Sequence, residues 1–167
     1  AAVYKKGSGL SFTVNFSEAI LVDTAKGIPS LIAVIGGVPK HVDYVSGSGT
    51  NALRFGYIIA YNDLDKKGIS LGATLSLNGS ILTDTAGNEA IIILKKMGAL
   101  SNVKIDGIAP SFIKDTPARL EICQDGAPVF LNELLGVTDM ETGEMLTWNI
   151  DTAPDHGTLS GFPTNKN

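Results

Sequence analysis

Cysteine is nearly absent from this sequence of 167 residues, since Cys123 is the only one. A single thiol can form neither an intramolecular disulfide nor a cysteine-based metal site. Long apolar runs are also missing: none exceeds five residues, as in residues 90–94, whereas about 20 are needed to span a bilayer. A net charge of −4 does not favour binding to nucleic acid or to an anionic membrane. We therefore expect no nucleic-acid partner and no direct membrane insertion.

The sequence also lacks the motifs of common catalytic and phosphate-binding sites. Gly47-Ser48-Gly49 does not have the Gly-x-Ser-x-Gly spacing of a nucleophile elbow, and neither a dinucleotide-binding nor a P-loop signature occurs. His41 and His156 have no serine or cysteine partner in a recognisable nucleophile motif. We therefore expect that the protein is not an enzyme.

Helical periodicity is missing as well, because no window of 11 residues repeats apolar positions at helical spacing. Short alternating segments are present instead. Residues 10–16 place Leu10, Phe12, Val14 and Phe16 on one face of a predicted strand. Residues 52–60 alternate in the same way, and we expect them to form the longest strand, in the centre of a sheet.

Turn signals separate several further strand patterns. Asn78-Gly79 is typical of a tight hairpin turn. About seven short strands at this spacing indicate an all-β fold, an antiparallel β-sandwich. The remaining predicted strands of this region are residues 30–35, 41–45, 69–77, 81–82 and 89–94.

One segment, Lys104-Ile105-Asp106-Gly107-Ile108-Ala109-Pro110, indicates a joint between two modules. Asp106-Gly107 is a turn dipeptide, and Pro110 supplies no amide hydrogen to a sheet. We predict a first module at residues 1–105, a linker at 106–110 and a second module at 111–167.

The second module is shorter than the roughly 100 residues of a complete sandwich, so we expect a partial β module. Its exposed strand edge would be frayed or covered by a partner copy, which makes self-association an expectation. Its predicted strands are residues 111–113, 118–122 and 146–150, with another beginning at 157–159. The apolar residues 129–135 predict a strand that bends into one helical turn.

Six segments of the first module follow one another in a recognisable order: Tyr4-Lys5-Lys6-Gly7, Phe12-Thr13-Val14-Asn15-Phe16-Ser17-Glu18, Tyr44-Val45-Ser46-Gly47-Ser48-Gly49-Thr50-Asn51, residues 63–69, Leu75-Ser76-Leu77-Asn78-Gly79 and Asp84-Thr85-Ala86-Gly87-Asn88. In these segments the first module resembles the immunoglobulin-like repeats of very large bacterial surface proteins and adhesins. Such repeats usually carry one more strand before the Tyr-Lys-x-Gly segment, so the resemblance implies that the chain starts inside a module.

The second module has a different set of segments: residues 131–137, Thr138-Asp139-Met140-Glu141, Leu146-Thr147-Trp148 and Ala153-Pro154-Asp155-His156-Gly157-Thr158-Leu159. In these segments it is similar to another repeat, the cadherin-like or chondroitin-sulfate-proteoglycan type. Both resemblances imply an extracellular or cell-surface bacterial protein built of tandem modules, which acts as a stalk or makes an adhesive contact. The implied partners are neighbouring modules of the same chain and a host or cell-surface protein or glycan.

Calcium is the cofactor to consider, because related repeats bind it in loops and at module joints. Calcium takes six to eight oxygen ligands, several of them carboxylates that converge on one point. Asp63 and Asp65 have a suitable spacing, but Lys66 and Lys67 place cations where further ligands are needed, so we favour a solvated polar loop over a calcium site here. The candidate ligands are Asp63, Asp65, Asp84, Asp106, Asp139 and Glu141.

These observations predict a non-catalytic structural or adhesive module, stiffened by calcium if the acidic loops converge. The alternative is a carbohydrate-binding or spacer module attached to a secreted enzyme. A row of exposed aromatic side chains on one sheet face would favour that alternative.

Overall fold

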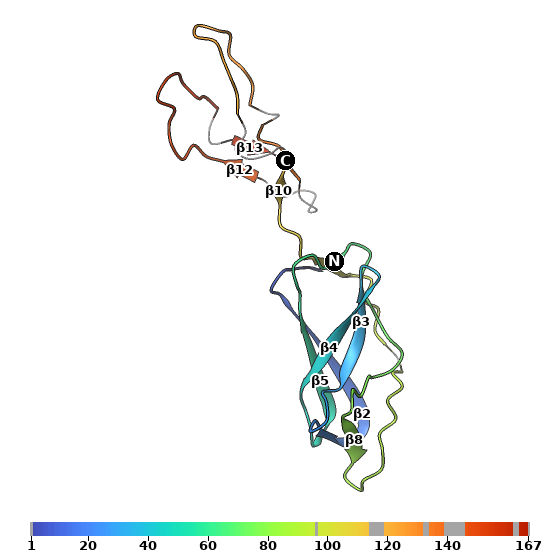
Figure 1. The fold of residues 1–167 in the computed structure, drawn as a ribbon. Coiled ribbons are helices and arrows are strands. Elements are labelled where there is room, and N and C mark those ends of the chain that lie inside the picture. The colour runs from blue at the N-terminus through green and yellow to red at the C-terminus, as the bar shows by residue number, and fades with distance from the viewer. Residues whose placement is uncertain are drawn as a thin grey trace. The chain divides into compact units, whose positions relative to one another are not determined.

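The computed structural model describes residues 2–95, 97–113, 119–131, 134–138, 146–161 and 164–166. The chain divides into two compact units, residues 1–109 (unit 1) and 110–167 (unit 2). The described residues contain strands, turns and irregular segments but no helix (Figure 1). The prediction of an all-β, sandwich-like fold is confirmed.

The larger sheet of unit 1 has six strands in the order β7-β3-β4-β5-β2-β8, and every neighbouring pair is antiparallel. β3 spans the residues that the apolar run predicted, and β4 and β5 pair as an antiparallel hairpin. The strands are β2 (Gly9–Asp23), β3 (Ser30–Ile35), β4 (Val38–Ser46), β5 (Thr50–Ile58), β7 (Ser70–Leu71) and β8 (Ile81–Asp84).

The smaller sheet has three strands in the order β1-β9-β6, namely β1 (Ala2–Lys5), β9 (Val103–Asp106) and β6 (Leu64–Asp65). β9 runs antiparallel to β6 but parallel to β1, with Ala2 opposite Val103 and Lys5 opposite Asp106. β9 therefore occupies part of the segment that the turn dipeptide Asp106-Gly107 had indicated as a joint. Its Ile105 side chain is buried in the core.

The core of unit 1 follows the alternation of the sequence. Leu53 and Phe55 of β5 are fully buried, as is Val42 of β4. On β2 the apolar residues of the 10–16 segment face inward and the polar residues between them are exposed. The expectation that 52–60 is the longest strand is wrong, because β2 has 15 residues and continues through a register shift between Asn15 and Ile20.

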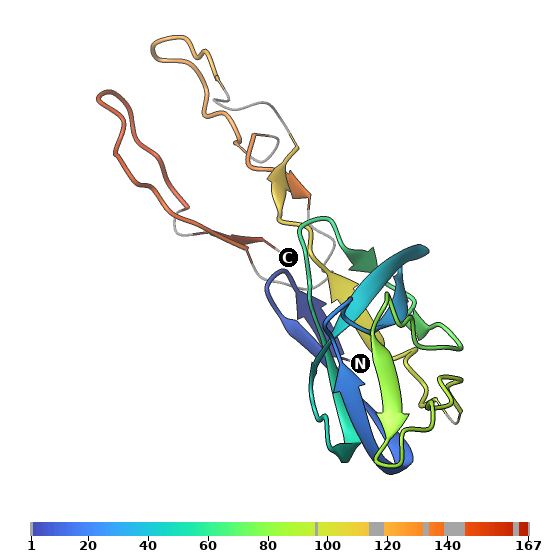
Figure 2. The same cartoon turned by 60° about the horizontal axis from the view of Figure 1, so that its bottom comes forward.

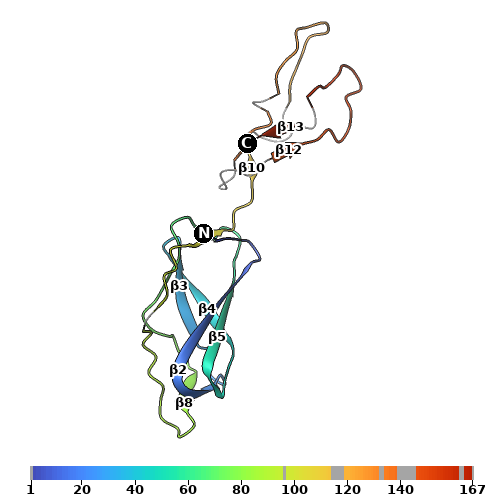
Figure 3. The same cartoon turned by 180° about the vertical axis from the view of Figure 1, so that it is seen from behind.

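Two irregular segments, residues 72–77 and 88–95, complete unit 1 instead of regular strands. They are held together by an isolated bridge between Thr74 and Ile93, and a second bridge joins Thr83 to Glu89. In Figure 3 the yellow-green segment that follows β8 runs beside the larger sheet up to β9. The strand predicted at 89–94 is thus reduced to single bridges.

Unit 2 contains two short antiparallel pairs: β10 (Ser111–Phe112) with β11 (Val137–Thr138), and β12 (Leu146–Trp148) with β13 (Thr164–Lys166). The rings of Phe112 and Trp148 lie 5.8 Å apart. Most of the residues described in this unit lie in long connections without strands (Figure 2). No strand forms in residues 119–122, 129–131 or 157–159, so these strand predictions are wrong for the described residues. A turn does form at the end of the 129–135 segment, where the N–H groups of Leu134 and Leu135 donate to Leu131 O.

Candidate functional site

Asp63 is the most buried carboxylate that the structure describes. It lies in the turn that follows β5, where Asn62 adopts a φ of 68°, and its side chain is 3% exposed. Lys40 of β4 approaches Oδ1 at 2.7 Å. The Tyr57 hydroxyl donates to Oδ2 at 2.5 Å, and the backbone N–H of Ala60 donates to the same oxygen at 2.8 Å. The cluster therefore fastens the turn to β4 and β5.

The electrostatics of this cluster follow from its contacts. Burial alone would raise the pKa of Asp63, but hydrogen bonds from Lys40, Tyr57 and the Ala60 N–H outweigh burial and hold the pKa below its usual value. Burial and the hydrogen bond to the Asp63 carboxylate raise the pKa of Tyr57 to about 12. Asp63 is therefore ionised and Tyr57 is a hydrogen-bond donor at neutral pH.

Asp65 belongs to a separate network. Its Oδ2 accepts from the backbone N–H of Gly36 at 2.8 Å, and its Oδ1 accepts from the N–H groups of Lys67 and Gly68 at 2.9 Å each. Asp63 and Asp65 are close in sequence, yet their oxygens serve different protein donors. A calcium ion would have to displace these donors, so the arrangement gives no support to the predicted calcium site at this loop.

The other predicted ligands are not brought together with these two. Asp84 closes its own loop by accepting from the N–H groups of Ala86 and Asn88, and the Asn88 side-chain amide is the main cause of its lowered pKa. Asp106 accepts from the Ile108 N–H. Within the described residues, no group of three or more His, Cys, Asp or Glu side chains could hold a metal ion. Asp139 and Glu141 lie outside the described residues.

Sequence reasoning missed one contact between a serine and a histidine. The Ser30 hydroxyl and Nδ1 of His41 are 2.9 Å apart, and the Asn78 side-chain amide donates to the same hydroxyl at 3.1 Å. Ser30 is completely buried, so no substrate can reach its oxygen. These two hydrogen bonds join β3, β4 and the Asn78-Gly79 turn. No sequence motif predicts them, because the three residues are far apart in the chain.

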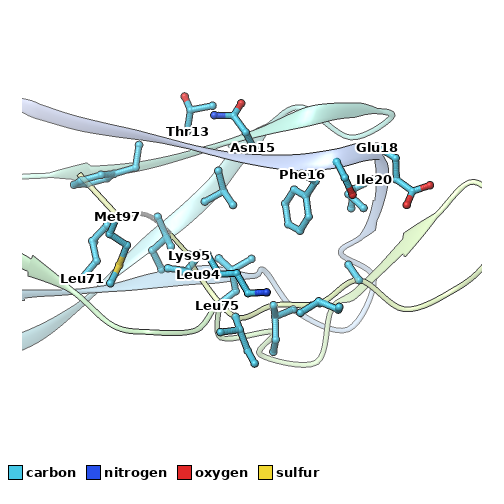
Figure 4. A pocket seen from close by; sticks show the side chains of 18 of the residues that line it. Thr13, Asn15, Phe16, Glu18, Ile20, Leu71, Leu75, Leu94, Lys95 and Met97 are labelled. Atoms are coloured by element: carbon cyan, nitrogen blue, oxygen red, sulfur yellow. The ribbon is translucent and has the colours of Figure 1, made fainter. Parts of the chain in front are cut away.

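Unit 1 also contains a groove of about 780 Å³ between β2 and residues 89–95 and 97–100, which we call the β2 groove. Figure 4 shows Phe16 and Ile20 pointing into it from β2, with Leu75 and Leu94 on the opposite wall. Glu18, Asp84 and Glu89 also line it, and Lys95 does so further along the chain. The volume falls in the range of ligand sites, but the described groove gathers no nucleophile and base that could act together.

On the side that faces the β2 groove, the backbone of each wall has no ladder partner among the described residues. Over Gly9–Asn15, β2 pairs only with β5, because β8 pairs with Ile20–Asp23 alone. On the facing wall, Ile92 O and Leu94 N bond to Leu75 and Ala73, so the backbone groups of Ile91 and Ile93 point the other way. The groove thus occupies the place of a strand that the described part of the sandwich does not contain.

No family model matches the chain, and searches of curated proteins and of solved structures also found no match. The resemblance to bacterial immunoglobulin-like and cadherin-like repeats therefore stays a prediction. The part of the chain that the structure describes contains no helix long and apolar enough to cross a membrane.

Proposed function

We propose that the chain is a non-catalytic structural or adhesive module of a multi-domain bacterial cell-surface or secreted protein, and that unit 1 transmits tension between its neighbours. Two features support this proposal: the division into two successive all-β units and the pairing of the two end strands of unit 1. The bacterial and extracellular setting rests on the sequence resemblance alone.

The observation that carries the proposal is the parallel pairing of β1 with β9. The chain enters unit 1 through β1 and leaves it through β9 toward Ala109. Tension on the two ends pulls β1 backward and β9 forward along the same axis. Because the strands are parallel, this force shears the whole ladder at once instead of opening it one hydrogen bond at a time. Four residue pairs share the force.

The polar clusters add to this arrangement. Asp65 of β6 lies opposite Ile105 of β9, and its carboxylate also holds the Gly36 N–H. The strand under tension is therefore connected through β6 to the turn between β3 and β4. Buried carboxylates used in this way stabilise loops and need no ligand.

A carbohydrate-binding module is less well supported. The sequence alternative required a row of exposed aromatic side chains on one sheet face. Of the aromatic side chains in unit 1, all of which are described, Tyr61 alone is exposed. One exposed ring does not form a stacking platform for a sugar.

Single-molecule pulling tests the proposal. The chain is held at its N-terminus and after Ala109, and we expect one cooperative unfolding event that releases on the order of 350 Å of chain.

A variant pair at Tyr4 tests the ladder itself. Ala2 N–H donates to Asn102 O, so alternation makes Tyr4 the next residue of β1 whose backbone bonds to β9. Tyr4→Pro should lower the unfolding force well below that of the matched Tyr4→Ala control. Equal unfolding forces for the two variants would show that the β1–β9 ladder does not resist the applied tension.

A further inference from the structure

We propose that the β2 groove of one copy accepts an extended strand from unit 2 of a second copy, and that residues 119–122 form this strand. The groove offers a place for a strand, and the same chain carries a segment with strand character and no sheet. The proposal names a partner and a site that the module function does not require.

The acceptor is suited to strand addition. The N-terminal half of β2 presents an open edge over Gly9–Asn15, and its apolar side chains Phe12, Val14 and Phe16 line the groove beneath that edge. A strand added here would continue the larger sheet through backbone hydrogen bonds and would place every second side chain on an apolar floor.

The donor has the matching pattern. Arg119-Leu120-Glu121-Ile122 alternates polar and apolar residues, and the sequence predicts a strand over this segment. Among the described residues it has no ladder partner. Leu120 is 44% exposed and Ile122 is 68% exposed, so both side chains are free to enter the groove.

Charge favours an encounter between unit 1 of one copy and unit 2 of another. Unit 1 has ten Lys and Arg against eight Asp and Glu, a net charge of +2, and unit 2 has three against nine, a net charge of −6. Opposite net charges steer association. Glu18 and Glu89, which line the groove, offer acidic partners to Arg119 of the donor.

The arrangement joins different surfaces of the two copies, so it is a head-to-tail contact that can extend to further copies. The donor is only four residues long, and such a small interface is weak. We therefore expect association at protein concentrations on the order of 100 μM.

Sedimentation equilibrium of the full chain tests the proposal, with a reductant present because Cys123 is exposed beside the donor segment. The weight-average mass should rise above the 17.5 kDa of one chain as concentration increases. Ile122→Asp on the donor and Ile93→Asp on the groove should each abolish the rise. Both positions are exposed, at 68% and 57%, so the fold should tolerate the changes. Ile113→Asp, at an equally exposed position of unit 2, is the matched control and should associate like the unchanged chain.

Mixing the two defective variants gives the sharpest result. Ile122→Asp retains an intact groove and Ile93→Asp retains an intact donor, so a 1:1 mixture should form a complex of two chains although neither variant associates alone. A chain that stays monomeric at 500 μM would overturn the docking proposal and leave the pulling test of the module function unaffected. Continued association of Ile122→Asp alone, or no complex in the mixture, would also overturn it.

Discussion

Replacement of Asp63 by alanine is the change that unit 1 should tolerate least among its polar residues. The carboxylate receives Lys40, the Tyr57 hydroxyl and the Ala60 N–H, and it is 3% exposed. Asp63→Ala removes the acceptor of all three donors at once. The Lys40 side chain is 29% exposed and can turn to water, whereas the other two donors are part-buried and lose their partner.

The expected loss of stability is about 3 kcal/mol. Hydrogen bonds to a charged group contribute roughly 1.5–3 kcal/mol each, and breaking a buried pair costs about 3–5 kcal/mol. We take the lower end of the range for breaking a buried pair, because Lys40 keeps access to water. For a unit of about 100 residues, this loss lowers the melting midpoint by roughly 15 °C. Circular dichroism melts of the variant and of Lys40→Met, which removes one donor only, measure the difference.

The pH dependence gives an independent check. The pKa of Asp63 is lower in the folded state than in the unfolded chain, so its contribution to stability is complete above the unfolded value of about 3.9 and is lost as pH falls through the folded pKa. Asp63→Asn has no charge to lose. The stability gap between the natural chain and Asp63→Asn should therefore stay constant above about pH 5 and shrink as pH falls below about 4. A gap that does not shrink, or an Asp63→Ala midpoint within 3 °C of the natural one, would refute the role assigned to this cluster.

Further predictions concern the neighbouring loops. Asp65→Ala should cost about 2 kcal/mol, and the amides of Gly36, Lys67 and Gly68 should then exchange hydrogen faster, as NMR would show. Gly68→Ala should cost about 2 kcal/mol or more in a denaturant titration, because φ is +102° and a Cβ would collide with the Ser101 backbone. Thermal melts in millimolar calcium and in a chelator should coincide, because protein donors already occupy the Asp63 and Asp65 oxygens. A rise of several degrees in calcium would contradict that reasoning and place a cation site in the acidic loops.

Local pattern predicted the strands whose residues alternate or form one apolar run, and it failed where a strand depends on a distant partner. β3 was predicted to the residue, and the inward face of β2 was predicted from alternation. β9 was missed because it is four residues long and ends in Asp106-Gly107, a turn dipeptide. Pairing with β1, about 100 residues earlier, and with β6, about 40 residues earlier, makes it a strand.

The candidate site was harder to predict for the same reason. The spacing of Asp63 and Asp65 indicated two carboxylates at one site. The approach of Lys40 and Tyr57 to Asp63, and of Gly36 to Asp65, depends on how three separate segments pack. Sequence periodicity could not predict the β2 groove, because the groove exists where the N-terminal half of β2 has no second neighbouring strand among the described residues.

The most direct test of the central claim is to change the direction of pulling. A handle after Ala109 loads the β1–β9 ladder in shear. A handle at Asn102→Cys, in a chain with Cys123→Ser, pulls at the end where β1 and β9 both begin and opens the ladder one bond at a time. We predict a much higher unfolding force between the N-terminus and residue 109 than between the N-terminus and residue 102. Equal forces in the two directions would contradict the claim that this strand pair carries the tension.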